Sequence, residues 1–192
     1  MTKKNLTGII LAGGQSSRMG SDKGLLLYQG KPLISYSIDV LAPLCSEILI
    51  SSNNELYNKF GYEVVADEIS GIGPMGGIYS CLKRSKNDLN LILSCDMPYV
   101  TGDIFQLLIE NMGKAIISLP WHKDEHYEPL CGVYHNDVLN FISSFIKKNN
   151  FKLPDLFKEI PFAPLNVSNL DPPLSDHYFF NINKPEDLTK KV

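Results

Sequence analysis

The chain has 192 residues, a formal net charge of −3, and 44% hydrophobic and 20% charged residues, so we expect one globular domain over residues 1–192. The negative charge gives no support for a nucleic-acid or membrane-surface partner, because such partners select a basic patch. No run approaches the ~20 apolar residues of a membrane-spanning helix, and the apolar run near the start is too short for a secretory signal. We therefore expect a cytoplasmic protein without a membrane partner.

Apolar runs separated by turn residues predict strands that alternate with helices. Strands are expected at residues 9–11, 47–51, 62–66, 89–94, 115–119 and 178–183. Helices are expected at residues 32–41, after the glycine-dense loop 71–77, and at 101–112, 138–146 and 185–188. Prolines break the stretch 154–173 into short pieces, and residues 122–126 are predicted to be a polar connector. This alternation predicts a three-layer, Rossmann-like α/β fold, with a mostly parallel sheet covered by helices on both faces.

The four cysteines show no C-x-x-C spacing, which argues against a zinc site. We interpret them as reduced, mostly buried small residues in a reducing compartment. For Cys95, which precedes the acidic residue Asp96, packing is favoured over a role as a catalytic thiol.

The first expected strand runs into a glycine loop, and residues 8–23 read GIILAGGQSSRMGSDK. Adjacent glycines let backbone N–H groups approach a ligand closely, while Arg18 and Lys23 supply cations suited to phosphate oxygens. The common phosphate-loop patterns do not fit, because Lys23 lies three residues beyond Gly20 and the first two glycines are adjacent. The loop indicates a nucleotide-binding site, the alternative being a strand-to-helix turn with incidental surface cations.

Polar residues follow several of the expected strands. In open α/β sheets ligands bind outside the carboxyl ends of the strands, so these residues are expected to meet in one crevice. Asp96, held by the following Met97 and Pro98, is a candidate Mg²⁺ ligand, with a helix cap or turn residue as its alternative role. The residues expected to converge are Gly13, Gly14, Ser51, Asp67, Asp96 and Asn181.

The glycine loop resembles the signature L-A-G-G-x-x-x-R-M-G-x-D-K of molybdenum cofactor guanylyltransferases, the MobA-type nucleotidyltransferases. The resemblance extends over residues 8–187 and implies a fold like that of nucleotide-diphospho-sugar transferases. It implies transfer of GMP from GTP to the molybdopterin-bound molybdenum cofactor, giving the guanine dinucleotide cofactor and pyrophosphate. The fixed positions present here are Leu11, Ala12, Gly13, Gly14, Arg18, Met19, Gly20, Asp22 and Lys23.

The same resemblance implies roles for individual residues. Arg18, Lys23 and Asp96 would be catalytic, with Asp96 binding Mg²⁺ as the cofactor. The residues implied to bind the nucleotide are Leu11, Ala12, Gly13, Gly14, Lys23, Asp67 and Asp96. Those implied on the pterin side are Gly76, Asn181 and Asn183, the two asparagines being expected on one side of a strand.

Two positions depart from the family pattern. Lys184 stands where a threonine is usual, and Ser51 stands where several members carry an asparagine, a role that Asn53 is a candidate to fill. Gly13 favours GTP, since cytidylyltransferases of this type more often carry L-A-A-G. The alternatives are a nucleotidyltransferase that uses CTP or a sugar or isoprenoid phosphate acceptor, and a non-catalytic nucleotide-binding module. Besides GTP and molybdopterin, the expected partners are proteins that deliver or accept the cofactor.

Overall fold

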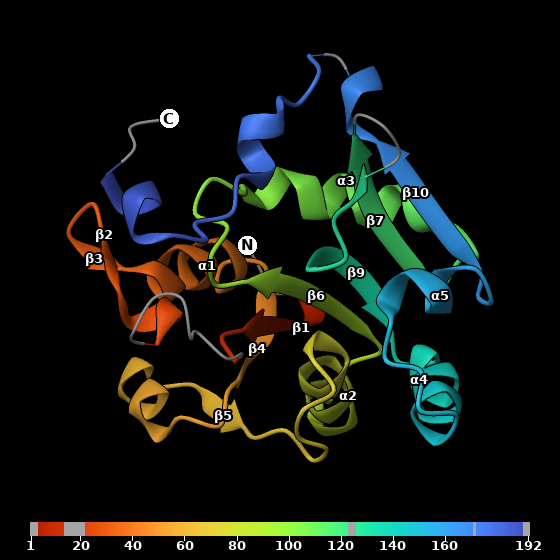
Figure 1. The fold of residues 1–192 in the computed structure, drawn as a ribbon. Helices are drawn as coiled ribbons and strands as arrows, with labels where there is room; N and C mark the ends of the chain where they lie inside the picture. The colour runs from red at the N-terminus through yellow and green to blue at the C-terminus, as the bar shows by residue number, and fades with distance from the viewer. Residues whose placement is uncertain (1–3, 14–21, 123–125, 171, 190–192) are drawn as a thin grey trace.

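The computed structural model describes residues 4–13, 22–122, 126–170 and 172–189 (Figure 1). Its main sheet has the strand order β10-β7-β9-β6-β1-β4-β5, and β8 pairs with β7. The strands are β1 Lys4–Leu11, β4 Cys45–Ser51, β5 Glu63–Val65, β6 Leu89–Ser94, β7 Ile117–His122, β8 His126–Tyr127, β9 Cys131–His135 and β10 Phe162–Asn166.

Parallel pairing dominates the middle of the sheet. β1 pairs in parallel with β4 on one side and β6 on the other, β5 continues in parallel from β4, and β10 is parallel to β7. β9 runs antiparallel between β6 and β7, and β8 is antiparallel to β7. The mostly parallel α/β sheet predicted from the sequence is therefore confirmed.

Helices cover both faces of the sheet (Figure 1). Alternate residues of a strand point to opposite faces, so Ile10 packs with Leu41 and Phe105, whereas Ile9 packs with Ile78 and Ile142 on the other face. The α-helices are α1 Leu33–Leu41, α2 Pro74–Arg84, α3 Gly102–Met112, α4 Val138–Lys147 and α5 Leu153–Phe157. The 3-10 helices are η1 Lys23–Leu25, η2 Glu55–Phe60, η3 Val167–Asn169, η4 Asp176–Phe179 and η5 Pro185–Thr189.

The expected helix at 32–41 begins one residue later, at Leu33. Its first residues are used instead in a hairpin, in which β2 (Leu27–Tyr28) pairs antiparallel with β3 (Lys31–Pro32). The turn between them has φ of 48° at Gln29 and 88° at Gly30, and the glycine adopts this left-handed conformation without steric cost.

Three expectations for the second half are wrong. Residues 178–183 form no strand, since η4 ends at Phe179. The following segment is attached to the turn after β6 by the bond from Ile182 N to Asp96 O (2.9 Å). The strand β10 was missed because it contains Pro164, which a sheet tolerates at its edge. Residues 122 and 126 belong to the paired strands β7 and β8 rather than to a plain connector.

Within the described residues, no helix combines the length and the apolar character that crossing a bilayer requires. All four cysteines are buried, as expected.

Candidate active site

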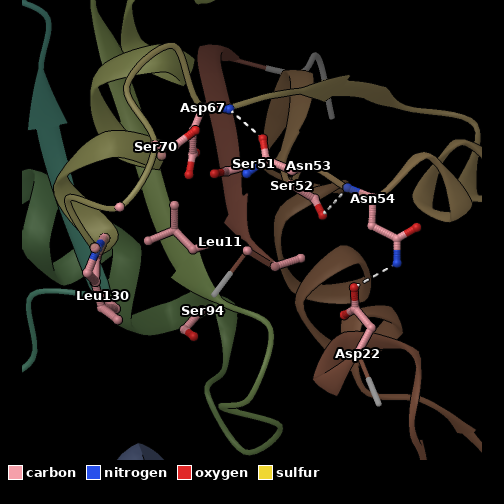
Figure 2. A pocket seen from close by; sticks show the side chains of 16 residues that line it. Leu11, Asp22, Ser51, Ser52, Asn53, Asn54, Asp67, Ser70, Ser94 and Leu130 are labelled. Carbon is pink, nitrogen blue, oxygen red and sulfur yellow. Dashed lines mark hydrogen bonds between the residues drawn. The ribbon is translucent and has the colours of Figure 1, made fainter. Parts of the chain in front are cut away.

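A pocket of about 740 Å³ opens at the carboxyl ends of β1, β4 and β5 and at the start of α2 (Figure 2). This volume is in the range of small-molecule sites, and the position is the one at which parallel α/β sheets bind ligands. The lining residues are Leu11, Ala12, Gly13, Asp22, Ser51, Ser52, Asn53, Asn54, Asp67, Ser70, Gly71, Gly73, Pro74, Gly77, Ser94 and Leu130.

The end of β1 is fixed by both neighbouring strands. Ala12 N donates to Ser51 O at 3.0 Å, and Cys95 N donates to Leu11 O at 3.1 Å. Gly13 follows as an exposed residue on the pocket wall. The structure thus brings the predicted nucleotide-binding residues Leu11, Ala12 and Gly13 to the pocket. Gly14 and the predicted catalytic residue Arg18 lie outside the described residues.

Asp67 lies across the pocket from the end of β1 (Figure 2). Its backbone N–H donates to Oδ1 of the exposed Asn53 at 2.9 Å. Burial raises the pKa of the Asp67 carboxyl above its ordinary 3.8, although a hydrogen bond from Asn53 opposes this shift. A partly desolvated carboxylate at a pocket wall is suited to accept hydrogen bonds from a ligand.

Ser51 and Asn53 both line the pocket, but only Asn53 is exposed. Ser51 is 2% exposed, and a Cβ at Gly77 would lie 2.2 Å from its Oγ. The first turn of α2 therefore packs directly on Ser51, which leaves little space there for a larger side chain. That Asn53 takes the role of the family asparagine stays a prediction.

Lys23 and Asp96 are in direct contact. The Lys23 ammonium group forms an ion pair with Asp96 Oδ2 and donates to Asn183 Oδ1 at 2.9 Å. Ser94, which lines the pocket, donates from Oγ to Asp96 Oδ1 at 2.6 Å. The Lys23 and Asp96 side chains are only 18% and 13% exposed, so the pair is largely sheltered from water. The fold thus joins a cation near the N-terminus, an acid in the middle of the chain and an amide near its end.

The predicted pterin-side residues are not equivalent. Asn181 Nδ2 donates to Phe179 O at 3.0 Å, within its own segment, and the absence of a strand there removes the expected alignment with Asn183. Asn183 is instead held by Asp187, whose Oδ2 accepts from Asn183 N at 3.0 Å.

Gly76 is buried inside α2, where a Cβ would lie 2.9 Å from Ile69 O. The neighbouring Gly77 is the residue that lines the pocket. Gly76 therefore packs against the backbone of the segment before α2, at Ile69, and does not line the pocket.

The donor set at Asp96 is compatible with Mg²⁺. From the residues that the structure describes, Asp96 Oδ1 accepts one hydrogen bond from Ser94 and Oδ2 one from Lys23, and a carboxylate oxygen has room for a second partner. The described residues contain no cluster of three or more acidic, histidine or cysteine side chains able to enclose an ion. A single carboxylate suits Mg²⁺, which retains water and takes substrate phosphates as its remaining ligands.

The thiols near the site are poor nucleophiles. Burial raises the pKa of Cys81 to about 12, and burial together with the nearby Asp96 charge also raises the pKa of Cys95. Because the thiolate is the reactive form, the burial of both cysteines favours a packing role over a catalytic one.

Residues 8–159 match the MobA-like NTP transferase domain. The chain belongs to this family. The resemblance seen in the glycine loop is thereby confirmed, and the match covers most of the fold, including the second half of β1, all of β6 and residues 71–77 before and at the start of α2.

Two MobA-like relatives span nearly the whole chain. The molybdenum cofactor guanylyltransferase of Vibrio parahaemolyticus is 36% identical, covering 95% of this chain and 92% of that protein. That of Vibrio vulnificus is 35% identical, covering 99% of this chain and 97% of that protein.

Solved structures agree on the fold. Molybdopterin-guanine dinucleotide biosynthesis protein A from Archaeoglobus fulgidus has a TM-score of 0.81 at 23% identity, covering 95% of this chain and 94% of that chain. The 2-C-methyl-D-erythritol 4-phosphate cytidylyltransferase from Thermus thermophilus has a TM-score of 0.69 at 13% identity, covering 94% of each chain.

The sequence interpretation missed Ser94 and Asp187 as supports of the site. Ser94 had a usable signal, because it ends a buried strand two residues before Asp96. Asp187 had only a local one, since it contacts the backbone of Asn183 and Lys184 within one turn.

Proposed function

We propose that this chain transfers GMP from GTP to the terminal phosphate of molybdopterin, forming the guanine dinucleotide cofactor and releasing pyrophosphate. The observation that carries the proposal is the contact of Lys23 with Asp96 and Asn183 beside a pocket of nucleotide size. The names of the relatives, which match nearly end to end, supply the substrate class.

The reaction needs no nucleophile from the protein. An oxygen of the pterin phosphate attacks the α-phosphorus of GTP, a new P–O bond forms, and the bond from the α-phosphorus to the bridging oxygen breaks. The electron pair of that bond leaves with pyrophosphate. The protein therefore acts by aligning two phosphates and by stabilising the charge that develops between them.

Nucleotide binding is assigned to the backbone of residues 11–13 and to the Asp67 carboxylate. Gly13 lines the pocket without a side chain, so the edge of a base can approach its backbone closely. The Asp67 carboxylate accepts hydrogen bonds from amino or hydroxyl groups. Asn53 orients Asp67 through the bond to its backbone N–H.

Charge stabilisation is assigned to Lys23 and Asp96. The Lys23 ammonium group neutralises charge on the departing pyrophosphate, and Asn183 restricts where that group can lie. Asp96 would hold Mg²⁺, which when bound supplies positive charge to the phosphate oxygens. Arg18 is assigned a similar role from the signature alone. The buried thiols suit a reducing compartment, so we place the reaction in the cytoplasm.

The deciding experiment incubates the purified protein with molybdopterin, Mg²⁺ and each common nucleoside triphosphate in turn, and identifies the product by mass spectrometry. A guanine dinucleotide formed from GTP, with release of pyrophosphate and dependence on Mg²⁺, supports the proposal. A cytosine dinucleotide, or no dinucleotide from any nucleotide, would contradict it.

A further inference from the structure

Tyr57 of η2 places a buried hydroxyl group between the end of β1 and Asp22, the residue before η1. Its side chain is 0% exposed, and its hydroxyl donates to Asp22 Oδ1. The same hydroxyl lies 3.5 Å from Ala12 O, at the end of β1. We call Ala12, Asp22 and Tyr57 the loop neck, since the first two flank the loop in sequence.

The Asp22 side chain does not cap the helix that follows it. Asp22 is the N-cap of η1, where an aspartate normally accepts from the backbone, yet its side chain makes no capping hydrogen bond. Its carboxylate instead accepts from Tyr57 and from Asn54 Nδ2, the latter at 2.8 Å (Figure 2). Asn54 is itself fixed, because its Oδ1 accepts from Leu56 N at 3.0 Å. The Asp22 carboxylate is therefore held by two donors from the β4–β5 connection.

The backbone at Gly24 fits closely against Tyr57. A Cβ at Gly24 would lie 2.4 Å from the Tyr57 hydroxyl oxygen and 3.2 Å from two ring atoms. Only a residue without a side chain allows this approach. Burial also raises the pKa of the Tyr57 hydroxyl, so that it stays protonated and remains a donor to Asp22.

Asp22 and Lys23 are consecutive in sequence, but their side chains bond to different parts of the fold. Asp22 reaches the β4–β5 connection, whereas Lys23 reaches Asp96 after β6 and Asn183 near the end of the chain. We propose that Tyr57 and Asn54 are positioning residues that fix Asp22 and so place the Lys23 ammonium group. The inference rests on the proposed function, because it concerns the cation assigned there to the pyrophosphate.

This arrangement reduces the freedom of a flexible side chain before substrate arrives. A lysine side chain loses considerable conformational entropy when it is fixed, and a backbone already anchored at the adjacent residue lowers that loss. Removal of the Tyr57 hydroxyl should therefore weaken stabilisation of the transition state more than binding of GTP.

The test replaces Tyr57 by phenylalanine and measures dinucleotide formation from GTP. Tyr57→Phe is expected to lower kcat about 10- to 100-fold, with the KM for GTP within about twofold of the native value. Adding Tyr57→Phe to Asp22→Ala is expected to cause no further loss, because Tyr57 acts through Asp22. Asp22→Asn, which keeps an acceptor oxygen, should retain more activity than Asp22→Ala.

Tyr36→Phe is the matched control. It removes another tyrosine hydroxyl with a protein partner, but that partner is the Tyr28 carbonyl in β2, at 2.9 Å, and not the Asp22 carboxylate. This variant is expected to keep the native kcat. Circular dichroism and thermal melting establish that each variant is folded.

Amide hydrogen exchange gives a readout that does not depend on activity. Leu25 N and Leu26 N bond to the carbonyl groups of Asp22 and Lys23, and their exchange should quicken in Tyr57→Phe but not in Tyr36→Phe. If the native protein makes no dinucleotide, the proposed function fails while the exchange result still decides this inference. Native kcat or unchanged exchange in Tyr57→Phe would overturn it, and so would equal losses in Asp22→Asn and Asp22→Ala.

Discussion

Gly13→Ala separates the fold from the choice of nucleotide. A Cβ at Gly13 would lie 3.5 Å from Ser51 O and 3.9 Å from Ser52 Cα, which is ordinary van der Waals contact. The φ angle of Gly13 is not positive, so an alanine can adopt the same backbone conformation without strain. The added methyl group therefore leaves the protein folded and projects at a wall of the pocket.

The magnitude follows from the guanine edge that the proposed function places against the backbone of Gly13. An extra methyl group pressed against a well-packed partner costs about 1–3 kcal/mol. Since about 1.4 kcal/mol corresponds to a factor of ten, kcat/KM for GTP should fall about 5- to 150-fold. The value for CTP should change less, because a pyrimidine base is smaller than guanine.

The assay measures kcat/KM for dinucleotide formation with GTP and with CTP, together with the midpoint of thermal unfolding. Gly102→Ala is the control. Gly102 begins α3, and a Cβ there would lie 3.4 Å from Leu44 Cδ1, which is also ordinary van der Waals contact. It is expected to leave both nucleotides unaffected. Unchanged use of GTP in Gly13→Ala, or equal losses for GTP and CTP, would refute the reasoning.

Two further predictions concern pH. Burial raises the pKa of Asp67 above its ordinary 3.8, so its ionised form opposes folding at neutral pH and this cost disappears in acid. Asp67→Asn should therefore raise the melting temperature at neutral pH but not below pH 3.8, while activity with GTP falls. A melting temperature that equals the native value at neutral pH as well as below pH 3.8 would contradict this. Burial also raises the pKa of Glu47, but hydrogen bonds from Lys86 and Thr7 outweigh it and bring the pKa below the ordinary 4.5. Stability from Glu47 is thus present above pH 4.5 and lost as pH falls through the lowered pKa, so Glu47→Gln should lower the melting temperature at neutral pH only; an equal loss in strong acid would exclude the ionic explanation.

The centre of the fold was predictable because local pattern and tertiary position agree there. The apolar runs of β1, β4 and β6 are buried on both faces, as a parallel sheet requires. Residues 178–183 look equally apolar, but Phe179 and Ile182 are buried as anchors of an irregular segment. Both sides of β6 are already occupied by β1 and β9, so residues 178–183 cannot pair with that strand. Such competition for a sheet edge cannot be read from a short window of sequence.

The candidate site was predictable to a similar extent. The rule that ligands bind at the carboxyl ends of parallel strands placed Gly13 and Asp67 at one pocket, and the structure brings Lys23 to Asp96. The partner of Asp22 was not predictable, because Tyr57 lies 35 residues away and follows no local pattern. This long-range side-chain contact arises only when η2 packs beside Ala12 and Asp22 in the folded chain.

The most direct test of the account concerns the role of Asp96 beside Lys23. Single-turnover formation of the guanine dinucleotide is measured for the native protein and for Asp96→Asn over a range of Mg²⁺ concentrations. The substitution keeps an acceptor for Ser94 or Lys23 but removes the charge, and the rate is expected to fall at least ~100-fold. A native rate in Asp96→Asn at the same Mg²⁺ concentration would contradict the central claim that this pair stabilises the transferring phosphates.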